Sequence, residues 1–174
     1  YNVVVEECTV PNERGISTLA PDKKPETTAE NNAPATQSIE PLGKIAFVSY
    51  GSSTTPERDP GIYVMNSDGS NQINLTKQDR GAERPSWSPD GTRIVFTSNR
   101  DVNREIYAMN ADGSNQTNLT KHPGEDTFPS WSPDGTKIAF TANRDGNLNI
   151  YVMNAEGRSH MRLTDSWADD FSPD

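Results

Sequence analysis

The chain of 174 residues is acidic, with a formal net charge of −9, and 31% of its residues are hydrophobic. Nucleic-acid binding depends on clustered Lys and Arg, so the acidic balance and the absence of such a cluster argue against it. No apolar run is long enough to predict a transmembrane segment. Cys8 is the single cysteine, which excludes an internal disulfide, and we expect an inert thiol or a contact with another chain.

The first forty residues differ in composition from the rest of the chain. Residues 1–10 contain a β-branched run, Val3, Val4 and Val5, that predicts a short extended strand. Residues 11–41 are rich in Pro, Thr, Glu and Asn and contain too little apolar surface to offset the entropy of ordering. We expect a disordered linker there, or a tail that lies on a partner, in front of a folded domain at 42–174.

Residues 42–174 contain sequence repeats. Trp131 follows Trp87 by 44 residues, and each tryptophan begins the motif Trp-Ser-Pro-Asp-Gly-Thr. The same step separates Met109 from Met153. A period of about 40–45 residues that holds several short strands is typical of one β-propeller blade, so we predict an all-β propeller of four-stranded blades.

Each full repeat predicts four strands joined by tight turns. Proline presets the backbone of the first turn and glycine supplies its positive φ. The residues that repeat in this turn and the tryptophan before it are Trp87, Pro89, Asp90 and Gly91 in one copy and Trp131, Pro133, Asp134 and Gly135 in the next. The second and third strands are predicted at 93–98 and 105–110, and again at 137–142 and 149–154.

The repeats do not amount to a closed ring. Blades are predicted at 83–120 and 127–164, the strands of another at 42–76, and the start of a further blade at 171–174. A propeller normally needs at least four blades, which bury their faces only against neighbours. We therefore expect a partial ring that is completed by further blades or by another chain.

The repeat resembles that of TolB-type propellers. The motifs that carry the resemblance are Ile-Tyr-x-Met-Asn-x-Asp-Gly, Asn-Leu-Thr and Pro-Ser-Trp-Ser-Pro-Asp-Gly-Thr. The resemblance covers residues 42–174. It implies a six- or seven-bladed propeller in a bacterial or archaeal extracytoplasmic protein, either periplasmic, secreted or at the cell surface. In this family such a propeller is a platform for binding envelope proteins, which implies a protein partner. Similar repeats occur in prolyl-oligopeptidase-like peptidases.

The repeated tryptophans and turn aspartates could be candidate site residues, but each has a structural explanation. We expect Trp87 and Trp131 to pack between blades. Asp90 and Asp134 are expected to accept hydrogen bonds from their own turns. Asp68 and Asp112 lie in turns that resemble parts of a calcium loop, but each turn offers one carboxylate where Ca²⁺ needs six or more oxygens. We therefore predict no metal and no other cofactor.

The candidate partner surface is where the repeats differ. Loops change in length or charge while the strands stay constant, which is typical of binding surfaces in repeat proteins. The charged residues of these candidate loops are Glu57, Arg58, Asp59, Glu125, Asp126, Asp169 and Asp170. The last four are predicted to lie at equivalent places in successive repeats.

Three functions remain open from the sequence. The first is a non-enzymatic interaction module of the cell envelope or surface. The second is the propeller part of a larger hydrolase or of a sugar lyase, although no Gly-x-Ser-x-Gly motif is present and His122 and His160 fall at non-equivalent places. The third is a structural subunit of a surface assembly, with residues 3–5 pairing to a neighbouring chain.

Overall fold

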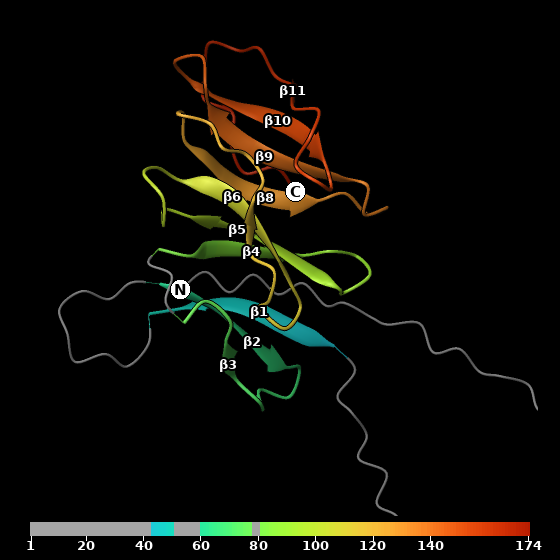
Figure 1. The fold of residues 1–174 in the computed structure, drawn as a ribbon. Coiled ribbons are helices and arrows are strands. Elements are labelled where there is room, and N and C mark those ends of the chain that lie inside the picture. The colour runs from blue at the N-terminus through green and yellow to red at the C-terminus, as the bar shows by residue number, and fades with distance from the viewer. Residues whose placement is uncertain (1–42, 51–59, 78–80) are drawn as a thin grey trace, which may run out of the picture.

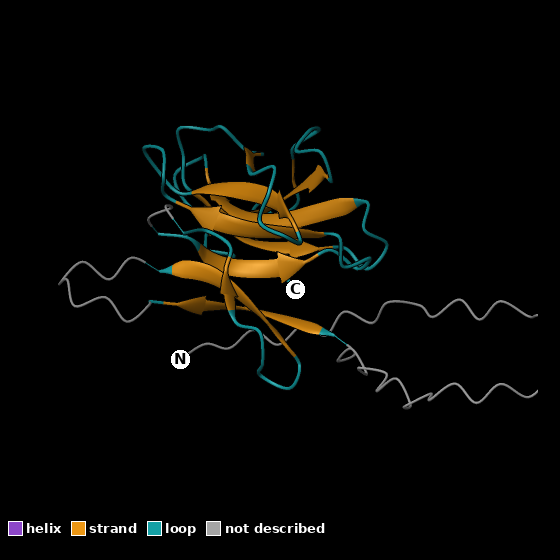
Figure 2. Ribbon diagram, turned by 60° about the horizontal axis from the view of Figure 1, so that its bottom comes forward, coloured by secondary structure: helices purple, strands orange, loops and turns teal. Residues whose placement is uncertain are grey.

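The computed structural model describes residues 43–50, 60–77 and 81–174. All regular structure in these ranges is β, and they contain no helix that could cross a membrane, as Figure 2 shows. The predicted N-terminal segment, 1–10 and 11–41, lies outside the described residues. The eleven strands are β1 (Lys44–Ser49), β2 (Gly61–Asn66), β3 (Ile73–Asn74), β4 (Glu83–Trp87), β5 (Arg93–Ser98), β6 (Glu105–Asn110), β7 (Thr117–Asn118), β8 (Asp126–Trp131), β9 (Lys137–Asn143), β10 (Leu148–Asn154) and β11 (Met161–Arg162).

The strands form three antiparallel sheets, each from consecutive strands. Blade 1 has the order β1-β2-β3, blade 2 the order β4-β5-β6-β7 and blade 3 the order β8-β9-β10-β11. The three sheets are stacked one on another along the chain (Figure 1). This arrangement confirms the predicted all-β partial propeller with a four-stranded repeat.

Alternation along the strands gives each blade two different apolar faces. In blade 2, Ile94 and Phe96 point to one side of β5 and Val95 to the other. Phe96 lies opposite Tyr107 on β6, with ring centroids 5.9 Å apart. The equivalent aromatic pairs in blades 1 and 3 have separations of 5.7 and 5.8 Å. Each blade therefore presents an aromatic-rich face on one side and an aliphatic face on the other.

The core consists of two layers between the blades. In each layer the aliphatic face of one blade packs against the aromatic-rich face of the next. The first layer joins Ala46, Ile62 and Val64 of blade 1 to Trp87, Ile94, Phe96, Tyr107 and Met109 of blade 2. The second joins Val95, Ile106, Ala108 and Leu119 of blade 2 to Ile138, Phe140, Tyr151 and Met153 of blade 3, with Trp131 packed beside them. Only blade 2 is thus covered on both faces within the described part of the chain.

The turn between the third and fourth strands also contacts the preceding blade. Gly157 has φ +74, and a Cβ built on it would lie 2.9 Å from the Leu119 Cβ and 2.8 Å from the Leu119 carbonyl oxygen. Gly113 approaches Leu75 in the same way, with a Cβ–Cβ separation of 3.1 Å. Glycine is therefore required here both for the positive φ and for the close approach of the blades.

We predict that Gly157→Ala lowers the free energy of unfolding by about 2–3 kcal/mol, because left-handed strain adds to a clash with the neighbouring backbone. Urea denaturation measures this loss. Gly146→Ala is the control, since Gly146 also has a positive φ but no neighbour within 4 Å of a built Cβ. Its loss should be about 1 kcal/mol. Equal losses for the two variants would contradict the proposed inter-blade contact.

Candidate functional site

The first strands of blades 2 and 3 share an unusual backbone. β4 has a register shift between Glu83 and Ser86, and β8 has one between Thr127 and Ser130. The bulged residues Arg84 and Phe128 both have φ +55. Left-handed backbone is uncommon for bulky residues and, where it is observed, supports a functional hypothesis. β4 and β8 also contact each other, so both bulges lie at the edge where the blades converge.

The bulged residues form a cluster with a third side chain. The Arg84 guanidinium carbon lies 3.6 Å from the centroid of the Phe128 ring. The Phe128 ring in turn lies 6.3 Å from that of Phe171, whose side chain is 61% exposed. We call Arg84, Phe128 and Phe171 the inner-edge cluster. It offers one cation and two aromatic rings on a shared surface.

Sequence reasoning missed the inner-edge cluster. Positions 84, 128 and 172 are each one repeat apart and hold Arg, Phe and Ser, all with positive φ. The available signal was a position whose side chain differs in each copy, immediately before the repeated proline. At such a bulge the backbone is the same in each blade and only the side chain differs. Binding specificity can therefore change there without altering the strands of the scaffold.

One of the predicted loop carboxylates does not face solvent. Asp126 is fully buried, and its carboxylate receives hydrogen bonds from Arg144 at 3.1 Å and 2.7 Å. The expectation that Asp126 belongs to an accessible acidic loop is therefore wrong. Asp126 is the first residue of β8, and its side chain points inward to the Arg144 guanidinium. This mostly buried guanidinium lies over the rings of Phe140 and Tyr151.

A histidine completes the contacts of this arginine. His160 Nδ1 lies 3.1 Å from Arg144 Nη1, and His160 Nε2 lies 3.1 Å from the Gly157 carbonyl oxygen. Because Arg144 can only donate, Nδ1 accepts and Nε2–H donates, which is the neutral form of the ring. Burial and the nearby Arg144 charge lower the pKa of His160. Nearby, burial raises the pKa of Glu105, whose carboxylate accepts a hydrogen bond from the His122 amide at 2.9 Å.

The other candidate loop residues serve local contacts. Glu125 forms an exposed ion pair with Arg104 at 3.5 Å. Asp169 accepts a hydrogen bond from the Leu148 amide at 2.9 Å, and Asp170 one from the Ser166 hydroxyl at 3.0 Å. Glu57, Arg58 and Asp59 lie outside the described residues. The structure therefore leaves Glu125 and Asp169 on the surface and does not join them to one another.

The turn aspartates are held by their own hairpins. The Asp90 carboxylate accepts hydrogen bonds from the Ser88 hydroxyl and the Thr92 amide. Asp134 does the same with Ser132 and Thr136, and these bonds lower the pKa of Asp134 to about 2. Asp68 and Asp112 likewise accept from the amides of Ser70 and Ser114. No group of three His, Cys, Asp or Glu side chains arranged for a metal occurs in the part of the chain that the structure describes.

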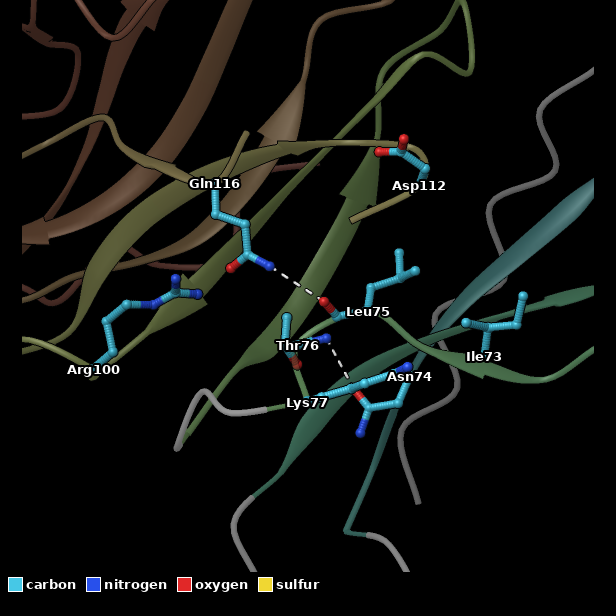
Figure 3. A pocket seen from close by; sticks show the side chains of 8 residues that line it. All are labelled: Ile73, Asn74, Leu75, Thr76, Lys77, Arg100, Asp112 and Gln116. Atoms are coloured by element: carbon cyan, nitrogen blue, oxygen red, sulfur yellow. Dashed lines mark hydrogen bonds between the residues drawn. The ribbon is translucent and has the colours of Figure 1, made fainter. Parts of the chain in front are cut away.

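A cavity of about 490 Å³ lies between blade 1 and blade 2, beside β3 and the turn before β7 (Figure 3). Gln116 reaches into it from blade 2, and its Nε2 donates to the Leu75 carbonyl oxygen at 3.2 Å. The hydroxyl of Thr76, which also lines the cavity, accepts a hydrogen bond from the Ile62 amide. His160 occupies the position equivalent to Gln116 in blade 3. These contacts indicate that the cavity is part of the seam between blades.

A family model of the TolB beta propeller domain matches residues 41–174. The chain belongs to the TolB β-propeller family. It is similar to the structure of a putative TolB from Agrobacterium tumefaciens, with 30% identity and a TM-score of 0.68 over 75% of this chain and 45% of that one. TolB from Acinetobacter baumannii is also 30% identical, with a TM-score of 0.62 over 72% of this chain and 30% of that one.

The TolB-type chain thus spans less than half the length of either TolB structure. Acylaminoacyl peptidase from Pyrococcus horikoshii matches with a TM-score of 0.52, over 69% of this chain and 23% of that one. Its identity of 14% shows a shared fold alone. No curated protein matches the chain.

We predict that Asp126→Asn lowers the free energy of unfolding by about 3 kcal/mol, because it leaves the mostly buried Arg144 charge without its counterion. Glu125→Gln is the matched control, since it removes the neighbouring but exposed ion pair with Arg104. The control should cost less than about 1 kcal/mol. Urea denaturation of both variants at pH 7 measures the difference. A small loss for Asp126→Asn would show that Arg144 is satisfied by other means.

The lowered pKa of His160 predicts an acid-sensitive contact. The unfolded chain takes up the histidine proton near pH 6.5, whereas the folded chain takes it up only at lower pH. The stability contributed by neutral His160 is therefore complete above pH 6.5 and is lost as pH falls through the folded pKa.

His160→Gln should remove this loss, and glutamine already fills the equivalent position in blade 2. Unfolding free energies of both proteins between pH 5 and pH 8 give the difference, in which the opposite contribution of Glu105 cancels. An identical pH dependence for the two proteins would refute the assignment.

Proposed function

We propose that this chain is a protein-binding module of the TolB type, and that its inner-edge cluster holds an extended segment of a protein partner. The observation that carries this proposal is the contact of Arg84 with Phe128 at two equivalent, left-handed bulges. A repeated backbone places different side chains at the same edge of successive blades. Such variation on a constant scaffold is how repeat proteins set binding specificity.

The chemistry of the cluster suggests what the partner segment presents. Phe128 and Phe171 offer apolar ring surface for an aromatic or aliphatic side chain. The Arg84 guanidinium lies with its carbon over the ring, which leaves its N–H groups able to donate to a carboxylate. The expected ligand is therefore a peptide segment in which an acidic residue lies close to an aromatic one.

The remaining polar groups support a non-enzymatic role. Arg144 donates to both Asp126 and His160 inside the seam between blades, and the turn aspartates accept hydrogen bonds from their own hairpins. These side chains are therefore engaged in structural contacts, although Asp and His are residue types that often act in catalysis. Resemblance to TolB also supports an extracytoplasmic location, with a partner in the cell envelope.

The test uses a displayed library of random twelve-residue peptides, selected on the 174-residue protein. We expect enrichment of peptides that pair an acidic with an aromatic residue. Phe128→Asn should weaken their binding at least tenfold while the thermal midpoint stays close to that of the unchanged protein, because asparagine tolerates left-handed backbone. Arg158→Gln is the control, since Arg158 is exposed on a turn away from the bulges and should leave binding unchanged.

Two results would overturn this proposal. One is selected peptides that bind equally well to the Phe128→Asn protein. The other is hydrolysis of the bound peptides by the protein, which would indicate an enzyme in place of a binding module.

A further inference from the structure

The cavity between blades 1 and 2 has a buried polar atom at its wall whose hydrogen-bonding capacity is not used. Gln116 donates through Nε2 to the carbonyl oxygens of Leu75 at 3.2 Å and Gly113 at 3.1 Å. Its Oε1 is also buried, but it accepts no hydrogen bond from any residue that the structure describes. Buried polar atoms are nearly always paired, so an unpaired acceptor at the wall of a cavity indicates a bound group that donates to it.

The next seam shows the same position with its acceptor in use. His160 is the equivalent of Gln116 one repeat later, and its Nε2 contacts the carbonyl oxygen of the turn residue Gly157 at 3.1 Å. Its Nδ1, which corresponds to Gln116 Oε1, lies 3.1 Å from Arg144 Nη1. The His160 ring also packs edge-on against Phe140, with centroids 5.7 Å apart. Histidine therefore both accepts a hydrogen bond and fills space where glutamine does neither.

The wall of the cavity has an apolar part and a cationic part. Ile73 and Leu75 of blade 1 supply apolar surface, and the cations that line the cavity are Lys77 and Arg100. In Figure 3 the Gln116 oxygen points to the side where Arg100 lies, away from Leu75. The group that donates to this oxygen is therefore placed close to positive charge.

The chemistry of these charges favours an anion. The Arg100 guanidinium is held over the Tyr107 ring at 4.2 Å, and its Nε donates to the Ser98 hydroxyl at 3.1 Å. Asp112, which also lines the cavity, lies on the opposite side from Arg100 in Figure 3. Its carboxylate accepts hydrogen bonds from the Ser114 amide and hydroxyl of its own turn. A carboxylate beside Arg100 and Lys77 thus meets fixed positive charge.

We infer that this cavity binds a small hydroxylated organic acid, with a hydroxyl group donating to Gln116 Oε1 and the carboxylate facing Arg100 and Lys77. A hydroxyl group supplies the donor that an ionised carboxylate lacks. The carbon chain of the acid packs on Ile73 and Leu75. The cavity volume of about 490 Å³ is in the range of small-molecule sites.

The inference does not depend on the proposed function. β4 and β7 are the two edges of blade 2. The inner-edge cluster lies at the β4 edge, whereas the cavity lies beside the turn before β7. Loss of one site should therefore leave binding at the other unchanged.

The test titrates three matched compounds into the nitrogen-15-labelled 174-residue protein. NMR follows the side-chain amide of Gln116 and the backbone amides of residues 73–77. D-gluconate has a carboxylate and hydroxyl groups, sorbitol has the hydroxyl groups without the charge, and hexanoate has the charge without the hydroxyl groups. Gluconate should shift these signals and bind about tenfold more tightly than either of the others, because each lacks one of the two polar contacts.

Gln116→His gives this seam the residue that the next seam already has at the equivalent position. The ring takes the space of the acid, so gluconate binding should be lost while the thermal midpoint stays close to that of the unchanged protein. His160→Gln is the matched control, since it makes the reverse change in the other seam and should leave the gluconate shifts at residues 73–77 unchanged.

A second variant tests the charge without altering Gln116. Lys77→Gln should weaken gluconate binding about threefold, because an exposed cation contributes little to a salt bridge, and should leave the weak sorbitol shifts as they are. This comparison still decides the matter if Gln116→His does not fold.

Four results would overturn the inference. Signals that do not respond to any of the three compounds would show that the cavity holds water only. Hexanoate binding as tight as that of gluconate would show that Gln116 Oε1 receives no hydroxyl group. Sorbitol binding as tight as that of gluconate would show that the cations hold no carboxylate. Gluconate binding that persists in a folded Gln116→His protein would place the acid elsewhere.

Discussion

The structure depends on the packing of two unlike sheet faces. Each blade presents an aromatic-rich face on one side and an aliphatic face on the other, and the aliphatic face of one blade packs against the aromatic-rich face of the next. A single four-stranded sheet cannot bury both faces, so its stability depends on the blades beside it. Burial of apolar surface contributes about 25 cal/mol for each Å² removed from water, and the largest fully buried apolar side chains lie in these seams.

Other contacts adjust this packing without replacing it. Gly113 and Gly157 let the turns approach the leucines of the preceding blade. Asp126 and Arg144 place a paired charge at the seam between blades 2 and 3, and Ala82 holds the position equivalent to Asp126 in blade 2. The seam is therefore the same in outline from blade to blade but differs in its polar contacts. The inner edge, where Arg84 and Phe128 meet, keeps the same left-handed backbone while its side chain differs from blade to blade.

The fold could be predicted from the sequence because the repeat shows it directly. The candidate site could not, because it depends on bulges and on strand pairing that the repeat pattern does not show. The second and third strands of blade 2 begin and end where the 44-residue pattern predicts, since alternation and turn residues are local properties. The inner-edge cluster was not predicted, because a bulge and a positive φ at Phe128 depend on long-range pairing of β8 with β9. Asp126 was misread for a similar reason. Its neighbour Glu125 is exposed, and only the folded chain shows that Arg144 lies beneath Asp126.

The central claim is that one type of seam, used twice within the chain, stabilises the blades. Hydrogen exchange of the backbone amides tests it most directly. The account predicts that amides of β5 and β6 are the most strongly protected, since blade 2 is covered on both faces. Amides of β1 and β10 should exchange faster, because blades 1 and 3 each have one face that no neighbouring blade covers among the described residues. Equal protection of these four strands would contradict the claim.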